Sequence, residues 1–276
     1  MGSSNLKKLQ MIALLGLVTF VALGYVVVQR GVKDLIHFSI GTFRAVGPMT
    51  KQTRSVAAFD RIQAGHVYDV DVTYGAVPML VIEAPSDLMP HLTSSVNNGT
   101  LSLGANTGFN LSGNQRVKAH VVTKRLVGAN VSGASRLVIN GVTKDASFDA
   151  HLSGASTLRM SADVDTFEIQ ASGAAKTTLT GLTAKNLTVN ASGASNCSIN
   201  GKALESKIEL SGASHLEGQF QSNRADVEAS GASQASLRVR DSLTGEASGA
   251  STITYSGLPA HVDTHVSGVS KVNRAG

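Results

Sequence analysis

The sequence predicts an all-β protein, a single-domain parallel β-helix of about 19 residues per coil, preceded by an N-terminal transmembrane helix. Three observations lead to this prediction. The tetrapeptide Ser-Gly-Ala-Ser, or a near copy of it, recurs at almost constant spacing through the second half of the chain. Around each copy, apolar and polar residues alternate with a period of two, which is typical of strands. An uncharged apolar run lies close to the N-terminus.

The composition excludes several classes of protein. The chain has 276 residues, of which 16% are charged and 4% aromatic, and its single cysteine excludes a disulfide scaffold and a cysteine zinc site. The formal net charge of +5 is unevenly distributed, because residues 1–54 carry seven basic side chains and one acidic one, whereas the other residues carry 17 basic and 18 acidic ones. The basic balance therefore belongs to the N-terminal flank, and we predict no nucleic-acid partner. No cofactor-binding motif is present, so no cofactor is expected.

Residues 11–28 form the apolar run, eighteen residues without a charge. A helix of this length spans about 27 Å, close to the thickness of the hydrocarbon core of a bilayer. We therefore predict a single-pass membrane anchor, with residues 1–10 as a short cytoplasmic N-terminus and the following domain on the periplasmic side. The alternative is a secreted protein released by cleavage of a signal peptide, since Lys7 and Lys8 precede the run and Ala22–Gly24 offers small residues for cleavage.

Two segments separate this run from the repeats. Residues 29–54 are predicted to be a basic linker. Residues 55–104 are predicted to form irregular N-terminal rungs that cap the β-helix. In that segment Tyr68–Tyr74 alternates apolar and polar residues, Met79–Ile82 is a second strand candidate, and Asn98-Gly99 is a typical hairpin turn.

The repeats occupy residues 105–276, and successive copies of the motif are 18 to 21 residues apart. One such rung cannot bury its own apolar side chains, so we expect the rungs to stack as parallel strands about 4.8 Å apart. The eight copies begin at Ser132, Ser153, Ser172, Ser192, Ser211, Ser230, Ser248 and Ser267.

All eight copies share one register. Counting in twos from the motif glycine, taken as facing inward, the fourth motif position and the residues before and after the motif also face inward. We expect the fourth-position serines to form a ladder of hydroxyl groups bonded to one another. The predicted inward structural residues are Gly133, Gly154, Gly173, Gly193, Gly212, Gly231, Gly249 and Gly268, with Ser135, Ser156, Ser195, Ser214, Ser233, Ser251 and Ser270.

The repeats also suggest candidate chemistry on the outward side. The position two residues before each motif holds Glu209, Glu228 and Glu246 in three successive copies, so stacking would align three carboxylates. Such a column could bind a hard cation such as Ca²⁺, and the alternative is a solvated acidic face. Cys197 occupies an inward apolar position and is expected to be a buried packing residue rather than a nucleophile.

An enzyme acting on polysaccharides is the alternative function, because parallel β-helices also carry that chemistry. It requires convergent carboxylates with basic partners. The densest acidic group, Asp163, Asp165 and Glu168, has no clear basic partner in the sequence. We therefore predict no catalytic residue.

The repeats, together with Phe59–Ile62, Val70–Val72 and Asn98–Leu103, resemble the putative auto-transporter adhesin head GIN domain family over about residues 46–272. The resemblance implies an exported or envelope-anchored bacterial parallel β-helix and supplies no catalytic residue. Many members are lipoproteins, and this chain differs by carrying an apolar segment instead of a lipidated cysteine.

The sequence thus predicts a membrane-anchored, non-enzymatic β-solenoid that serves in binding, adhesion or scaffolding of the cell envelope. Its expected partners are the membrane, through residues 11–28, and a protein or glycan ligand on the solenoid surface. An uncapped C-terminal rung would expose strand edges, so self-association at that end is also expected.

Overall fold

A computed structural model describes residues 42–43, 45–106, 110–111 and 116–275. The apolar segment 11–28 lies outside these residues. Within the described part, none of the helical segments has the length and hydrophobicity that a membrane span requires. The short strands β1 (Thr42–Phe43) and β8 (Asn110–Leu111) form a separate two-stranded sheet.

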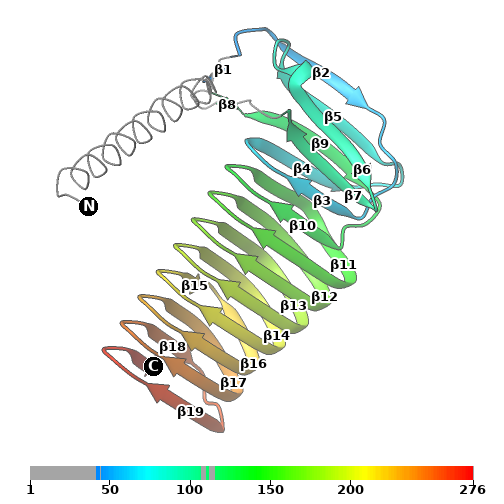
Figure 1. The fold of residues 1–276 in the computed structure, drawn as a ribbon. Helices are drawn as coiled ribbons and strands as arrows, with labels where there is room; N and C mark the ends of the chain where they lie inside the picture. Colours follow the sequence, from blue (N-terminus) through cyan, green and yellow to red (C-terminus); the bar gives the residue numbers. More distant parts are fainter. Residues whose placement is uncertain (1–41, 44, 107–109, 112–115, 276) are drawn as a thin grey trace, which may run out of the picture. The chain divides into compact units, whose positions relative to one another are not determined.

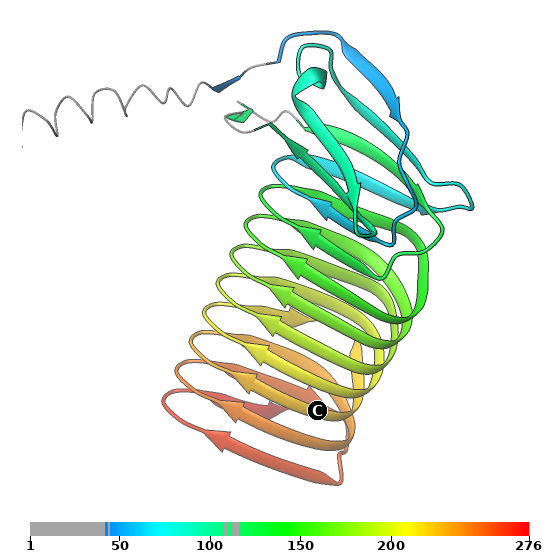
Figure 2. The same ribbon diagram turned by 45° about the vertical axis from the view of Figure 1, so that its right-hand side comes forward.

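The repeats form a parallel β-solenoid, as the sequence predicts (Figure 1). Each strand pairs in parallel with the equivalent strand of the next rung, and Figure 2 shows the rungs stacked in sequence order. The strands are β10 (Gly128–Val131), β11 (Arg136–Leu152), β12 (Thr157–Ala171), β13 (Lys176–Ala191), β14 (Asn196–Leu210), β15 (His215–Glu217), β16 (Phe220–Ala229), β17 (Gln234–Ala247), β18 (Thr252–Ser256), β19 (His261–Val266) and β20 (Lys271–Arg274).

Before the repeats, the chain forms one irregular rung and an antiparallel layer. Strands β3 (Arg61–Ala64) and β4 (Tyr68–Tyr74) pair in parallel with β10 and β11, and so extend the solenoid ladder. They also pair in parallel with β7 (Thr100–Ala105) and β9 (Val117–Thr123). Strand β5 (Met79–Pro85) is antiparallel to β9, β6 (Leu92–Asn97) is antiparallel to β7, and one 3-10 turn spans Met89–His91.

The linker predicted over residues 29–54 requires a correction. Its last six residues, Met49–Arg54, form β2, which pairs antiparallel with β5. Most of these side chains are exposed, so backbone hydrogen bonds rather than apolar burial hold the strand in place. The sequence of this strand therefore lacks the alternation of apolar and polar residues from which a strand is predicted.

The predicted inward direction of the motif glycines is wrong. All eight lie exposed at a turn, in the left-handed region of φ between 70° and 77°. The turn interrupts the strand, so the alternation fails at the glycine itself, although the buried positions before and after the turn keep the predicted parity. At each turn the backbone passes close to the rung before it. A Cβ on Gly154 would lie 2.8 Å from the carbonyl oxygen of Gly133, and one on Gly193 would lie 2.6 Å from that of Gly173. Left-handed backbone and close stacking both require glycine.

The fourth-position serines are buried, as predicted, and Ala175 takes the same place in one rung. The expected hydroxyl ladder is not formed. The hydroxyl of Ser195 donates to the carbonyl oxygen of Ser192 at 2.8 Å, and Ser214, Ser233 and Ser270 repeat this bond within their own turns. These four hydroxyls are therefore satisfied locally, because the first residue of the same turn offers a carbonyl oxygen three residues back. The Ser251 hydroxyl instead donates to the Ala229 carbonyl oxygen of the rung before, at 2.8 Å, and the buried Ser156 hydroxyl has no partner among the described residues.

Apolar side chains in register fill the interior of the solenoid. The rings of Phe148 and Phe167 stack with centroids 5.3 Å apart, and Cys197 is completely buried. The residues before each motif are buried from Val131 to Ala247, as predicted. Val266 on β19 is instead 51% exposed, because no later described strand covers it.

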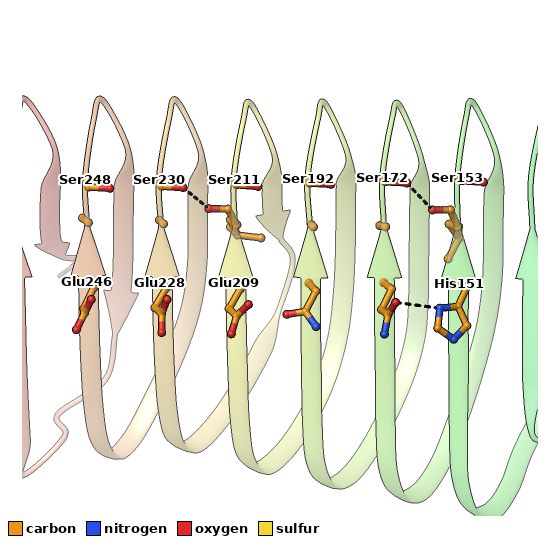
Figure 3. A pocket seen from close by; sticks show the side chains of 18 of the residues that line it. His151, Ser153, Ser172, Ser192, Glu209, Ser211, Glu228, Ser230, Glu246 and Ser248 are labelled. Atoms are coloured by element: carbon orange, nitrogen blue, oxygen red, sulfur yellow. Dashed lines mark hydrogen bonds between the residues drawn. The ribbon is translucent and has the colours of Figure 1, made fainter.

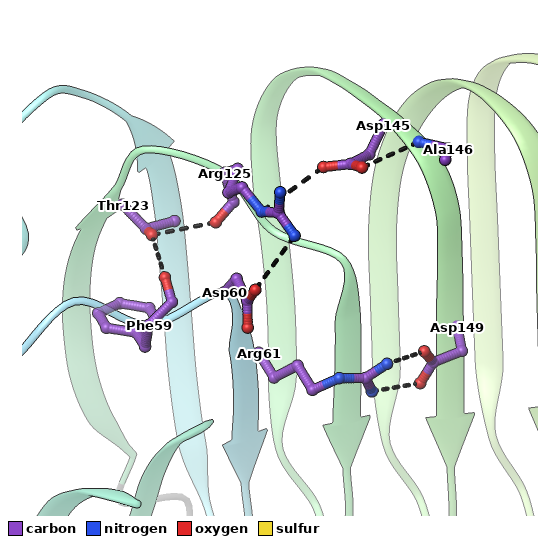
Figure 4. Close-up of polar contacts among 8 residues, drawn as sticks. All are labelled: Phe59, Asp60, Arg61, Thr123, Arg125, Asp145, Ala146 and Asp149. Atoms are coloured by element: carbon purple, nitrogen blue, oxygen red, sulfur yellow. Dashed lines mark hydrogen bonds and ion pairs between the residues drawn. The ribbon is translucent and has the colours of Figure 1, made fainter. Parts of the chain in front are cut away.

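Ion pairs join the first rung to the repeats (Figure 4). The Arg61 guanidinium on β3 binds the Asp149 carboxylate on β11 through two hydrogen bonds, which raises the pKa of Arg61. The strand between them places Gly128 at this point, and a Cβ there would lie 2.5 Å from the Arg61 side chain. Arg125 bridges Asp60 at 3.2 Å and Asp145 at 3.7 Å. Because Gly128 has no side chain, the Arg61–Asp149 ion pair can cross β10 and connect β3 to β11.

Candidate ligand-binding groove

A groove of about 890 Å³ runs along one side of the solenoid, from Asn130 in the first rung to Ser267 in the last motif copy, and Figure 3 shows part of it. Two columns of polar side chains line it, and the small or apolar residues between them, such as Leu152, Ala171 and Ala191, complete the lining. The shared register of the rungs produces the groove, because each rung places the same two positions at the same place.

The first column is the outward position two residues before each motif. It consists of Asn130, His151, Gln170, Asn190, Glu209, Glu228, Glu246 and His265, and each is the register partner of the next. The alignment of carboxylates predicted from the sequence is thereby confirmed. Figure 3 shows the three glutamates side by side on adjacent strands.

The second column is the first serine of the last seven motif copies, a position that the residue pattern alone does not mark as a site. It consists of Ser153, Ser172, Ser192, Ser211, Ser230, Ser248 and Ser267. Ser172 and Ser230 donate weakly to carbonyl oxygens of the rung before, at 3.4 Å. The hydroxyls of Ser192, Ser211 and Ser248 make no hydrogen bond to any described residue, so they are available to a ligand.

The chemistry of the first column changes along its length. His151 Nδ1 lies 3.1 Å from Gln170 Oε1, and the Gln170 amide donates to Glu168 at 2.6 Å. The Asn190 side-chain oxygen is buried without a partner among the described residues. Beyond Asn190 the column becomes acidic. The column therefore passes from amide and imidazole groups to three carboxylates and ends at the imidazole of His265.

One cation lies beside the acidic part of the groove. Lys207 Nζ is 2.7 Å from Glu209 Oε1, and this hydrogen bond raises the pKa of Lys207. Glu228 and Glu246 form no ion pair with the described residues. Across the described ranges, no group of three or more His, Cys, Asp or Glu side chains has an arrangement that could hold a metal ion. The cation site stays a prediction.

The acidic group Asp163, Asp165 and Glu168 does not line the groove. The expectation that it lacks a basic partner is wrong for Asp165, whose carboxylate lies 2.9 Å from Lys185 Nζ. Lys185 is 20 residues further along the chain, and only the stacking of rungs brings it there.

Cys197 is expected to be unreactive while the protein is folded. Burial raises the pKa of its thiol to about 12, so at about pH 8 almost none of it is the nucleophilic thiolate. Because the folded-state pKa lies above the unfolded value, raising the pH through the alkaline range destabilises the fold. Iodoacetamide labelling followed by mass spectrometry should show no native adduct and full modification in denaturant. Rapid native labelling would contradict the burial of this thiol.

The fold and this groove define a class: a parallel β-solenoid that carries a long polar surface groove. A family model described as "Putative auto-transporter adhesin, head GIN domain" matches residues 58–185 and 167–259. The chain therefore belongs to this family, which confirms the resemblance seen in the sequence.

Solved structures share the fold at low sequence identity. A putative lipid binding protein from Parabacteroides distasonis has a TM-score of 0.80 at 16% identity, covering 85% of this chain and 100% of that one. A putative adhesin from Parabacteroides merdae has a TM-score of 0.80 at 17% identity, covering 85% and 99%. One from Bacteroides fragilis has a TM-score of 0.66 at 18% identity, covering 84% and 100%. No curated protein matches the chain.

Proposed function

We propose that the protein is a non-enzymatic binding module of the bacterial cell envelope, which holds an extended glycan in its groove. The observation that carries this proposal is the groove itself. It crosses eight rungs and offers a hydroxyl and an amide, imidazole or carboxylate at nearly every one. A linear polymer with repeated hydroxyl groups matches a surface whose donors and acceptors recur about every 4.8 Å. A protein segment is the other ligand that the sequence suggested.

The proposed location follows from the family and from the apolar segment. The family model describes an adhesin head, which supports a surface or extracytoplasmic place for the solenoid. Residues 11–28 would then anchor the chain in the membrane, with the solenoid on the periplasmic side. A secreted form, cleaved after the apolar run, is the alternative.

The arrangement of the carboxylates favours binding over catalysis. Glycoside hydrolysis uses two carboxyl groups that flank the bond to be cleaved. Here Glu209, Glu228 and Glu246 follow one another along a single column, and the other column of the groove consists of serines. No pair of acids within the groove therefore faces a ligand from two sides.

A blocking substitution tests the proposal. We expect the full chain, in an uncharged detergent, to retain members of a glycan array, and Ser192→Tyr to weaken binding of the strongest glycan at least tenfold, which is about 1.4 kcal/mol. Ser192 is exposed and lines the groove, so the added ring occupies ligand space without disturbing the core. Isothermal titration calorimetry measures the change.

Ala194→Tyr is the matched control. Ala194 is exposed in the same turn but does not line the groove, so this variant should bind within about twofold of the wild type. A parallel assay for new reducing ends should detect no turnover. The proposal fails if no glycan binds, if both tyrosine variants weaken binding equally, or if the bound glycan is cleaved.

A further inference from the structure

We propose that a second pocket, which shares no residue with the groove, binds a phosphate ester group through Lys202 and Arg238. This pocket has a volume of about 680 Å³ and is lined by residues of β13, β14, β16, β17 and β18. Its volume falls in the range of pockets that take small molecules, about 300–1,000 Å³.

The charges that line this pocket have one sign. Lys202 and Arg238 contribute to it, and none of its lining residues is an aspartate or glutamate. Neither cation forms an ion pair or hydrogen bond with the described residues. By contrast, three other cations on β13, β14 and β16 each bind a carboxylate; they are Lys185, Lys207 and Arg224. Two uncompensated cations at one pocket attract an anion.

The register places the two cations on either side of one amide. Lys202 pairs with Gln221, and Gln221 pairs with Arg238. The backbones at Lys202 and Arg238 are therefore two strand spacings apart, about 9.6 Å. Thr183 precedes Lys202 in this column and Ser256 follows Arg238, and both line the pocket. The column thus reads hydroxyl, ammonium, amide, guanidinium, hydroxyl.

An interruption of the ladder contributes to the pocket. Strand β15 ends at Glu217, and β16 begins at Phe220, so the rung breaks at Gly218 and Gln219. Both residues of the break line the pocket, together with Phe220, Leu237 and Tyr255. A Cβ on Gly218 would lie 2.3 Å from the Ile199 carbonyl oxygen, so this break requires glycine. Phe220 and Leu237 are buried in the solenoid interior, whereas Tyr255 is partly exposed, so the pocket combines a cationic column with one accessible aromatic side chain among these three.

A phosphate ester fits this combination. Its oxygens point in several directions, so one group can accept a paired contact from the Arg238 fork and a further contact from the flexible Lys202 side chain. The Gln221 amide and the flanking hydroxyls supply further donors. The partly exposed Tyr255 ring can pack against the organic part of the ester, which can belong to a soluble molecule or to a lipid headgroup.

Calorimetric titration of the full chain in uncharged detergent distinguishes these sources. The probes are glycerol phosphate, short-chain phosphatidic acid and, as a lipid without a phosphomonoester, short-chain phosphatidylcholine. We expect glycerol phosphate or phosphatidic acid to bind, and Arg238→Gln and Lys202→Gln each to weaken that binding at least tenfold. Arg159→Gln is the matched control, because Arg159 is exposed on β12, has no partner among the described residues and lies outside the pocket.

Each outcome decides the matter. Binding of glycerol phosphate that is lost in the pocket variants, with Arg159→Gln within about twofold of the wild type, supports a site for soluble esters. If phosphatidic acid binds and glycerol phosphate does not, and the variants have the same effects, the result supports a site for a lipid headgroup. The proposal is overturned if neither phosphate probe binds, if phosphatidylcholine binds as well as phosphatidic acid, or if all three variants weaken binding equally. The groove and its glycan play no part in these titrations.

Discussion

Gly193→Ala is expected to lower the free energy of unfolding by about 3 kcal/mol, because the substitution meets two separate obstacles. Gly193 has a φ of 75°, in the left-handed region that L side chains rarely adopt. Its Cβ would also lie 2.6 Å from the Gly173 carbonyl oxygen, and this neighbour is backbone that cannot rotate away. Chemical denaturation followed by circular dichroism measures the change.

Gly181→Ala separates these effects from the loss of a glycine as such. Gly181 lies outside the left-handed region, and a Cβ added there would have the Ser161 hydroxyl as its nearest neighbour, at 3.7 Å. We expect this variant to change stability by less than about 1 kcal/mol. Equal losses in the two variants would show that the stacked turns do not depend on close backbone contact.

The local character of the damage is a second readout. In a solenoid each rung contacts only its neighbours, so strain at one turn is shared with the rungs on either side. Hydrogen exchange should therefore speed up first near Gly173, Gly193 and Gly212 in the alanine variant. The amide of Ala194, which donates to the Gly173 carbonyl oxygen at 2.7 Å, is the most direct reporter.

The repeat period made the ladder predictable, and the same reasoning fails where the chain leaves strand geometry. Val131, Ser135 and Leu137 are buried as the alternation indicated. Gly133 lies between them but is exposed, because left-handed backbone at the turn ends the alternation. A pattern of side-chain types can therefore give register, but not the path of a turn.

The candidate sites were visible in the sequence only in part. The column of Glu209, Glu228 and Glu246 follows from spacing alone, since parallel stacking aligns equivalent positions. The groove beside this column depends on the orientation of the motif turn relative to the strand before it. The pattern of residue types does not determine that orientation. The pocket at Lys202 and Arg238 depends on the break at Gly218, and that break is a departure from the repeat rather than a part of it.

Phe167→Ala is expected to cost about 3–5 kcal/mol, the range for removing a buried aromatic side chain. Phe167 is completely buried, and its ring stacks on Phe148 of the rung before it, with ring centroids 5.3 Å apart and an interplanar angle of 23°. On its other side it pairs in register with Leu187. Truncation thus opens a cavity between two rungs and removes the ring contact.

Phe167→Leu shows whether volume or ring stacking dominates. Leucine occupies the equivalent place in the next rung, at Leu187, so the interior accepts that shape and the loss should be about 1–1.5 kcal/mol. Thermal unfolding of the full chain, with both variants measured beside the wild type, gives the comparison. If alanine cost no more than leucine, the interior would have to collapse around the missing ring. Rungs fixed to one another by continuous backbone hydrogen bonds on both sides leave little freedom for that collapse.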